Sequence, residues 1–340
     1  SRGKMKVFEV GCGKGTDLFH WDYVHKNVRT ISFYFGTDND KSGLMRHDGA
    51  YYRYLQGNRH NRLNTRKQTL DGKYAFDALF VQADASVSFQ QCRERSWDGQ
   101  RQRGVSKHKL DYELLRYVLY GKTPEDVALG NVFHGGMVHP TYNLVSCQFA
   151  LHHFADDKQA FWNNLNMLLS VDGLFIATVP NGDFISAQLH KSTNGEYTVP
   201  IRDAKNPNSI VQWYKYESSR NKNKVFFQTP KISRSEEPLL RKDQLLRTIR
   251  KHFDVVYMDT FAQYVSKQQL DIYKTSCDSK GVFHAASIDG DTLAHTFTGK
   301  HSHLANNVRE TPEALRYSQQ GHYVVVLCKK NGRSEAELDA

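Results

Sequence analysis

The 340-residue sequence predicts an α/β fold with a mostly parallel seven-stranded sheet, helices on both faces of it and long insertions. Short apolar runs typical of buried strands alternate with segments of helical spacing, which is the pattern of a parallel sheet. Three of these runs end at an acidic residue, where ligands bind to such sheets. Three polar stretches are much longer than ordinary connections between strands and helices.

The expected elements follow one another along the whole chain. Strands are expected over residues 6–10, 30–35, 76–83, 142–151, 174–179, 255–261 and 323–328. Helical spacing is found over residues 15–26, 41–55, 110–120, 158–170 and 244–253. This alternation favours a single sheet whose strands run mostly in one direction.

The long polar stretches cover residues 85–141, 181–242 and 266–321. Insertions at one end of such a sheet usually form the substrate site, and disordered decoration is the alternative for each. The middle stretch contains strand-like patches such as residues 225–228. We expect one domain over residues 1–330 and a tail over residues 331–340.

Composition narrows the class of partner. The formal net charge of +10 favours a polyanion such as RNA, although ordinary surface lysines and arginines give the same balance. Aromatic and basic residues are interleaved over residues 51–54 and 213–216, which suits stacking combined with phosphate contact. The five scattered cysteines form no CxxC pair, which favours a reducing compartment over a zinc site or disulfides. No signal peptide or membrane-length apolar run is visible, so we expect a cytoplasmic protein without a membrane partner.

A glycine-rich turn follows the first expected strand. It reads Glu-Val-Gly-Cys-Gly-Lys-Gly-Thr-Asp over residues 9–17. Its glycines let the backbone turn tightly beside a helix N-terminus, which suits a ligand. Thr16 stands where a dinucleotide fingerprint requires glycine. The spacing resembles instead the first motif of S-adenosylmethionine methyltransferases, in which Glu9 would suit the cationic amino-acid part of the cofactor.

Two further acids end the next two strands. Asp38 follows the second strand, and a carboxylate there can accept both ribose hydroxyls of a nucleoside. Asp84 follows the third, where it can meet an adenine amino group. Each acid alone is more often a loop residue or a helix cap. Together with Glu9 beside a glycine turn, they predict a nucleoside site.

A family resemblance rests on two later segments. Residues 146–154 read Ser-Cys-Gln-Phe-Ala-Leu-His-His-Phe, and residues 173–181 read Gly-Leu-Phe-Ile-Ala-Thr-Val-Pro-Asn. With the glycine turn, these segments resemble the messenger RNA cap guanine-N7 methyltransferase family. The resemblance implies a Rossmann-like class I fold, S-adenosyl-L-methionine as cofactor with S-adenosyl-L-homocysteine as product, and capped RNA as substrate. The long insertions are not accounted for by the resemblance, and their place at one end of the sheet leads us to expect that they form the cap and RNA site.

The resemblance assigns roles to single residues. It places cofactor contacts at Gly11, Gly13, Asp17, Asp38, Asp84, Gln148 and His153, beside Glu9. It places cap contacts at Lys14, His20, Arg53, His152, Glu237 and Tyr323. Three departures from the family pattern are His153 in place of tyrosine, a longer helix before Arg53, and Pro238 within the segment that follows Glu237.

The family also carries helices and a cofactor-binding lysine ahead of its first strand, where this sequence has almost nothing and only Lys4 or Lys6 could stand in for the lysine. This fits excision from a multifunctional capping enzyme with triphosphatase and guanylyltransferase domains in the same chain. The departures at His153 and in the insertions suggest that the enzyme is that of a large cytoplasmic DNA virus. The expected location is then the host cytoplasm or virion, or the nucleus for a cellular enzyme.

The chemistry implied by the resemblance is an in-line displacement. Guanine N7 carries a lone pair and no proton, so no general base is required, and Glu237, His152 and Tyr323 would only position the substrate. A metal site at His152 and His153 near Cys147 is the alternative use of the histidines. It is not expected, because adjacent residues of a strand point to opposite faces. A non-catalytic RNA- or partner-binding module and a methyltransferase for another substrate remain alternative functions.

Overall fold

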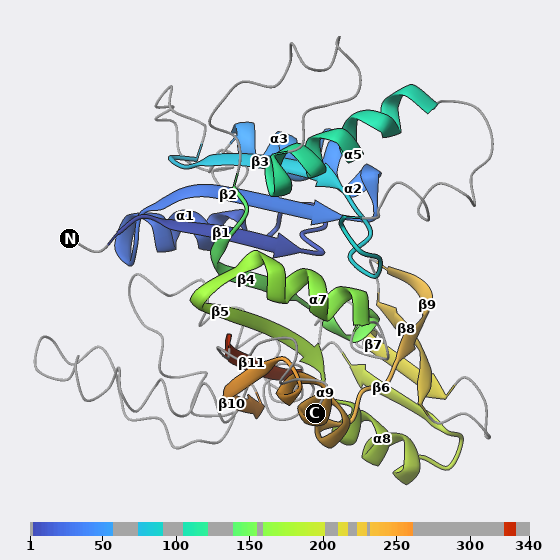
Figure 1. The fold of residues 1–340 in the computed structure, drawn as a ribbon. Helices are drawn as coiled ribbons and strands as arrows, with labels where there is room; N and C mark the ends of the chain where they lie inside the picture. Colours follow the sequence, from blue (N-terminus) through green and yellow to red (C-terminus); the bar gives the residue numbers. More distant parts are fainter. Residues whose placement is uncertain are drawn as a thin grey trace, which may run out of the picture. The chain divides into compact units, whose positions relative to one another are not determined.

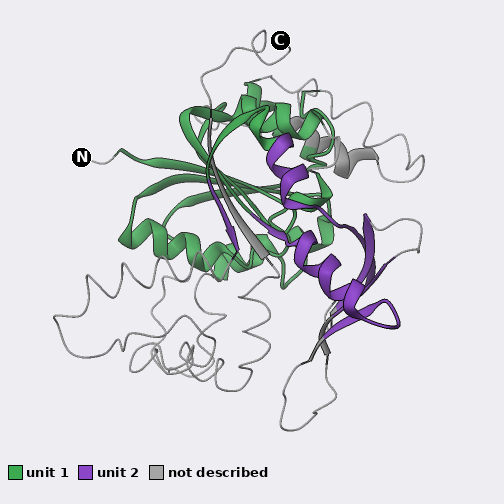
Figure 2. Ribbon diagram, turned by 90° about the horizontal axis from the view of Figure 1, so that it is seen from below, with its two compact units in different colours: residues 1–177, 249–256, 327–340 green, residues 178–248, 257–326 purple. Residues whose placement is uncertain are grey.

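The structure is a computed structural model that describes residues 3–56, 74–90, 105–121, 139–154, 159–200, 210–216, 223–229, 232–260 and 323–330. The chain divides into two compact units (Figure 2). Unit 1 comprises residues 1–177, 249–256 and 327–340, and unit 2 comprises residues 178–248 and 257–326. The expectation of one domain over residues 1–330 stays a prediction, and the expected tail lies outside the described residues.

The central element is a seven-stranded sheet with the order β10-β11-β5-β4-β1-β2-β3 (Figure 1). Its strands are β1 (Met5–Val10), β2 (Ile31–Asp38), β3 (Asp77–Gln82), β4 (Tyr142–Gln148), β5 (Leu169–Pro180), β10 (Phe253–Thr260) and β11 (Tyr323–Lys330). β1 pairs in parallel with β2 on one side and β4 on the other, and β2 pairs in parallel with β3. The strand order therefore reverses at β1, and such switch points are where open α/β sheets bind ligands.

Helices of unit 1 lie on both sides of this sheet (Figure 2), which confirms the predicted α/β architecture. The helices of the described residues are α1 (Leu18–Asn27), α2 (Lys41–Met45), α3 (Ala50–Gln56), α5 (Val105–Tyr120), α7 (Gln159–Leu168), α8 (Gly182–Lys191) and α9 (Lys242–Arg250), with a 3-10 turn, η2 (Leu151–His153). β1 and β2 are buried along nearly their whole length because sheet neighbours and helices cover them. None of the helices in the described part of the chain is long and apolar enough to span a bilayer.

The single helix predicted over residues 41–55 is wrong, because two short helices occupy this segment. Arg46 leaves the helical conformation with ψ 162°, and α3 begins only at Ala50. Gly49 explains the tight connection, since a Cβ there would lie 2.6 Å from the carbonyl oxygen of Gly43.

Unit 2 contains an antiparallel sheet that the sequence pattern indicated only in part. Its strands are β6 (Glu196–Pro200), β7 (Ile210–Tyr216), β8 (Lys224–Thr229) and β9 (Ile232–Pro238), in that order. α8 covers one face, with Ile185 and Leu189 packed against Tyr214, Val225 and Leu239. The described part of the insertion over residues 181–242 therefore forms regular secondary structure, and the alternative of a disordered insertion does not hold for it. The insertion over residues 266–321 lies outside the described residues.

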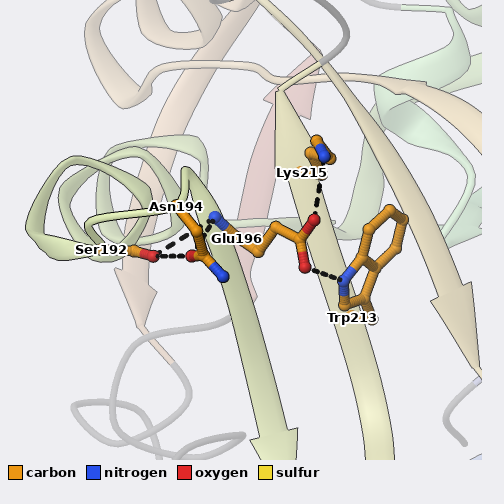
Figure 3. Close-up of polar contacts among 5 residues, drawn as sticks. All are labelled: Ser192, Asn194, Glu196, Trp213 and Lys215. Carbon is orange, nitrogen blue, oxygen red and sulfur yellow. Dashed lines mark hydrogen bonds and ion pairs between the residues drawn. The ribbon is translucent and has the colours of Figure 1, made fainter.

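The pleat of β7 separates the interleaved aromatic and basic side chains. Trp213 and Lys215 point to one face, where both donate hydrogen bonds to the Glu196 carboxylate, at 3.3 and 2.9 Å (Figure 3). Tyr214 is buried on the opposite face, and the hydroxyl of Tyr216 lies 2.8 Å from Ser186 Oγ of α8. Much of this segment therefore stabilises unit 2 and is not available as a whole for RNA.

Candidate functional site

The site begins at the turn between β1 and α1. Gly11, Gly13 and Gly15 all have positive φ, of 70°, 51° and 66°, which accounts for glycine at all three positions. A Cβ on Gly11 would come within 2.7 Å of the Ala150 Cβ, so this turn packs directly against the segment that follows β4. The amides of Gly11 and Cys12 donate to the carbonyl oxygen of Thr37, at 2.8 and 3.0 Å, which ties the turn to β2.

Asp38 fixes the end of β2 against the same turn. Its Oδ2 accepts a hydrogen bond from the Gly13 amide at 2.8 Å, and its Oδ1 accepts one from the Asp40 amide at 2.7 Å. Burial raises the pKa of this carboxyl above its usual value, although the backbone donors partly oppose the shift. The carboxylate is thus held in one orientation, and each oxygen retains a lone pair for a ligand.

A cavity of about 470 Å³ lies beside these groups, entirely within unit 1. It is lined by residues at or after the carboxyl ends of β1, β2, β3 and β4: Val10, Gly11, Asp38, Asn39, Ala83, Asp84, Ala85, Ser86, Gln148, Phe149, Ala150, His153 and Phe154. Five residues predicted to contact the cofactor therefore meet at one cavity: Gly11, Asp38, Asp84, Gln148 and His153. Its volume is in the range of small-molecule sites.

The cavity also includes residues that the sequence analysis did not single out. Phe149 is the clearest, because it is half exposed and has a positive φ of 56°, which is uncommon for an aromatic residue. Such backbone strain is concentrated at functional sites. The cavity wall also contains Asn39, Ser86 and Phe154. Each of them follows a strand end or the turn after it, and this position in the sequence could have indicated that they line the site.

Glu9 lies elsewhere than expected. It is 2 % exposed and does not line the cavity. Its Oε2 accepts hydrogen bonds from Trp21 Nε1 at 2.6 Å and from the Tyr34 hydroxyl at 2.8 Å. Burial, and then the neighbouring carboxyl of Asp17, raise the pKa of Glu9 to about 8. Its direct contact with a cofactor stays a prediction that the burial of the side chain does not favour.

Three predicted cap residues lie in or near α1 and α3: Lys14 precedes α1, His20 lies in its first turn, and Arg53 lies in the last turn of α3. Lys14 Nζ forms a 2.6 Å ion pair with Asp48, and Arg53 Nε donates to the Asp48 carbonyl oxygen at 2.9 Å. The ring of His20 lies on that of Phe19, with centroids 3.7 Å apart, and its charge acts on Asp17. The structure therefore brings Lys14 and Arg53 together at Asp48.

The remaining cap residues lie on other elements. Glu237 is on β9 of unit 2, where Ser235 Oγ donates to its Oε1 at 2.7 Å. Tyr323 begins β11, but its side chain lies outside the described residues. His152 is buried in η2.

The expectation that His152 and His153 point to opposite faces of a strand is wrong. β4 ends at Gln148, and the two histidines lie in η2, where their ring centroids are 4.0 Å apart. Strand alternation therefore gives no reason against shared use of the pair, and the expected absence of a metal stays a prediction.

Comparison with known proteins adds to this geometry. A "Probable mRNA-capping enzyme" of Acanthamoeba polyphaga mimivirus is 25 % identical over 236 residues, which cover 68 % of this chain and 15 % of that protein. The "mRNA cap guanine-N(7) methyltransferase" of Caenorhabditis briggsae is 31 % identical over 123 residues, covering 34 % of this chain and 29 % of that protein. The chain thus spans less than a third of either relative.

A solved structure of an S-adenosylmethionine-dependent methyltransferase from Clostridium acetobutylicum aligns over 96 % of this chain and 84 % of that one, at 9 % identity and a TM-score of 0.41. The profile of the mRNA (guanine-N(7))-methyltransferase domain, by contrast, matches residues 1–217, which include the glycine turn and every residue that lines the cavity. The matched residues make up more than half of the chain, so the chain belongs to the mRNA (guanine-N(7))-methyltransferase family.

Proposed function

We propose that this chain transfers the methyl group of S-adenosylmethionine to N7 of the guanine cap of RNA. The observation that carries the proposal is the cavity at the β1 switch point, with Asp38 and Asp84 in its wall, in a chain of this family. The class of cofactor and the class of substrate both follow from the family.

The cavity residues fit the cofactor's nucleoside. Asp38 would accept hydrogen bonds from the ribose hydroxyls, since a carboxylate is acceptor-only and can bind two donors. Asp84 is held by the Ser86 amide, which donates to its Oδ1 at 2.8 Å, and its carboxylate would accept from the adenine amino group. Phe149 and Phe154 offer apolar surface for the flat base. These assignments support binding of the cofactor by residues of unit 1 alone.

S-adenosylmethionine supplies a methyl group already activated by its sulfonium. The guanine N7 lone pair forms the new N–C bond while the C–S bond breaks, and sulfur keeps the electron pair. N7 has no proton to lose, so the chain needs no general base. Its residues act by holding the guanine in line and by stabilising the positive charge that develops on the base.

Glu237 is the proposed partner of the guanine edge. That edge presents two donors, N1–H and the exocyclic amine, while N7 must stay free for the methyl group. A carboxylate accepts from both donors and favours the developing positive charge. His152, Lys14, His20, Arg53 and Tyr323 are proposed to hold the remainder of the cap.

Capped RNA is the proposed partner, supported by the net charge of +10 and by the exposed Lys14 beside Arg53. The mimivirus relative is described as a capping enzyme and is several times longer than the aligned segment. We therefore propose that triphosphatase and guanylyltransferase activities reside in the same longer chain, and that the protein acts in the cytoplasm.

The test is transfer of label from methyl-labelled S-adenosylmethionine to RNA. Capped RNA should accept the label, and the same RNA with a 5′-triphosphate in place of the cap should not. Labelling of both RNAs to the same extent would place the methyl group elsewhere and contradict the proposal.

A further inference from the structure

Asn164 is a buried polar side chain of α7 that the proposed mechanism does not use. It is 1 % exposed and lies on a helix whose other buried residues are nearly all apolar, namely Phe161, Trp162, Leu165 and Leu168. An amide in such surroundings costs free energy unless its donors and its acceptor find partners. The partners of this amide therefore indicate its role.

The hydrogen bonds of Asn164 that the structure describes all lead to one segment of the chain. Its Nδ2 donates to the carbonyl oxygens of Ala85 and Val87, at 3.3 and 2.8 Å. Its Oδ1 accepts from the Phe89 amide at 3.0 Å. This segment lies 75 to 79 residues before Asn164 in the sequence. A single side chain of α7 thus satisfies three backbone groups of a segment that follows a strand end.

The same segment forms part of the wall of the cavity in unit 1. Asp84, Ala85 and Ser86 line the cavity, and Asn164 itself does not. The segment and α7 both belong to unit 1, so their contacts lie within one compact unit. Asn164 can therefore act on a bound cofactor only through the backbone that it holds.

The sheet holds the start of this segment, and α7 holds the part that follows. β3 ends two residues before Asp84, and the Ala83 amide adds one further bond, to the Asp38 carbonyl oxygen at 3.0 Å. The Ser86 amide then turns back to Oδ1 of Asp84, at 2.8 Å. Such a local turn fixes the shape of the chain, but it does not fix the place of the turn relative to the sheet. The three bonds to Asn164 supply that second point of attachment.

We propose that Asn164 is a positioning residue that holds the Asp84 carboxylate in place for the amino group of the cofactor's adenine. This rests on the proposed contact between Asp84 and the adenine. The proposed ribose contact, at Asp38, is oriented separately by the amides of Gly13 and Asp40. Loss of the Asn164 amide should therefore weaken the adenine contact and spare the ribose contact.

The experiment measures by calorimetry the binding of two ligands to the full chain. They are S-adenosylhomocysteine and its analogue with hydrogen in place of the adenine amino group. The wild type should prefer S-adenosylhomocysteine by about tenfold or more, because the analogue lacks the donor that Asp84 accepts. Asn164→Asp keeps an oxygen for the Phe89 amide and loses both donors, and Asn164→Leu loses all three bonds at similar volume. In each variant the preference should fall below about threefold, while the affinity for the analogue stays near that of the wild type.

Two neighbours of Asn164 in α7 supply the controls. Asn163 is exposed, so Asn163→Asp makes the same chemical change one residue away and should keep the wild-type preference. Leu165 is buried, so Leu165→Ala destabilises the packing of α7 without removing the amide. It should also keep the preference.

The ratio of the two affinities separates positioning from a purely structural role, which would lower both affinities alike. An unchanged preference in a folded Asn164 variant would overturn the proposal, as would an equal loss of preference in Leu165→Ala. Failure of both Asn164 variants to fold would overturn it too, because the residue would then serve folding. A wild type without preference would refute the contact between Asp84 and adenine, and the proposal with it. Absence of any binding by the wild type would instead refute the cofactor site itself.

Discussion

The Glu237→Gln substitution tests the proposed guanine contact, and the pleat of β9 supplies its control. Glu237 lies opposite the buried Val225, on the face of the unit 2 sheet that α8 covers. Its neighbour Glu236 lies opposite Phe226 on the other face, where it forms an ion pair with Lys224. The two adjacent glutamates therefore serve different surfaces.

The size of the effect follows from the two hydrogen bonds that the substitution weakens. Gln keeps the volume of Glu237 and an oxygen that can accept from Ser235 Oγ, so the fold should persist. It removes the charge-assisted character of the two hydrogen bonds to guanine, and such bonds contribute about 1.5–3 kcal/mol against about 0.5–1.5 kcal/mol for neutral ones. A net loss of about 1.4 kcal/mol or more lowers kcat/KM for the cap at least tenfold.

The assay is steady-state methyl transfer to a short cap analogue, with S-adenosylhomocysteine affinity measured by calorimetry. Glu237→Gln should lose activity and keep cofactor affinity, whereas Glu236→Gln should keep both, because an exposed ion pair contributes little. Full activity of Glu237→Gln refutes the assignment. Loss of activity in Glu236→Gln with an intact Glu237→Gln would show that the register of the cap residue is off by one.

Two further predictions concern the cofactor and the RNA. Asp38→Asn should weaken cofactor binding by at least tenfold, since a charge-assisted bond of about 1.5–3 kcal/mol is removed. Asp40→Asn, at the N-cap of α2, should bind as the wild type does in calorimetry, since Asn can also cap the helix. Because burial raises the pKa of Asp38, this carboxylate takes up its proton at a higher pH than an ordinary aspartate does. On acidification, the affinity of the wild type for the cofactor should therefore begin to fall at that higher pH. An affinity that does not change on acidification would contradict this. Binding of long capped RNA should fall more steeply with salt than binding of a cap analogue, and equal slopes would mean that the basic surface does not touch the RNA body.

The strand ends that form the cavity could be predicted from the sequence. The apolar runs before Asp38 and Asp84 are strong strand signals, and parallel strands necessarily bring their carboxyl ends to one edge. The role of Glu9 could not be predicted in this way. It has the sequence position of a ligand-binding acid, but its partners Trp21 and Tyr34 are 12 and 25 residues away, and only the packing of α1 and β2 brings them to its carboxyl.

The remaining differences also have physical causes. Trp213 and Tyr214 are consecutive aromatics, so β7 lacks the alternation of apolar and polar residues that marks a half-buried strand. Its two faces both need aromatic side chains, one against α8 and one around Glu196. The apolar run that continues to Leu151 predicts a strand up to the His152–His153 pair, whereas Phe149, with its positive φ, follows the end of the strand at Gln148.

The most direct test of the account is the position of the transferred methyl group. Capped RNA would be incubated with the chain and S-adenosylmethionine, digested with a nuclease that spares the cap, and analysed by mass spectrometry with fragmentation of the released cap. The account predicts one methyl group per cap, on N7 of the guanine, with one S-adenosylhomocysteine formed for each. A methyl group on a ribose oxygen or on another base atom would contradict it, as would turnover of the cofactor without methylated cap.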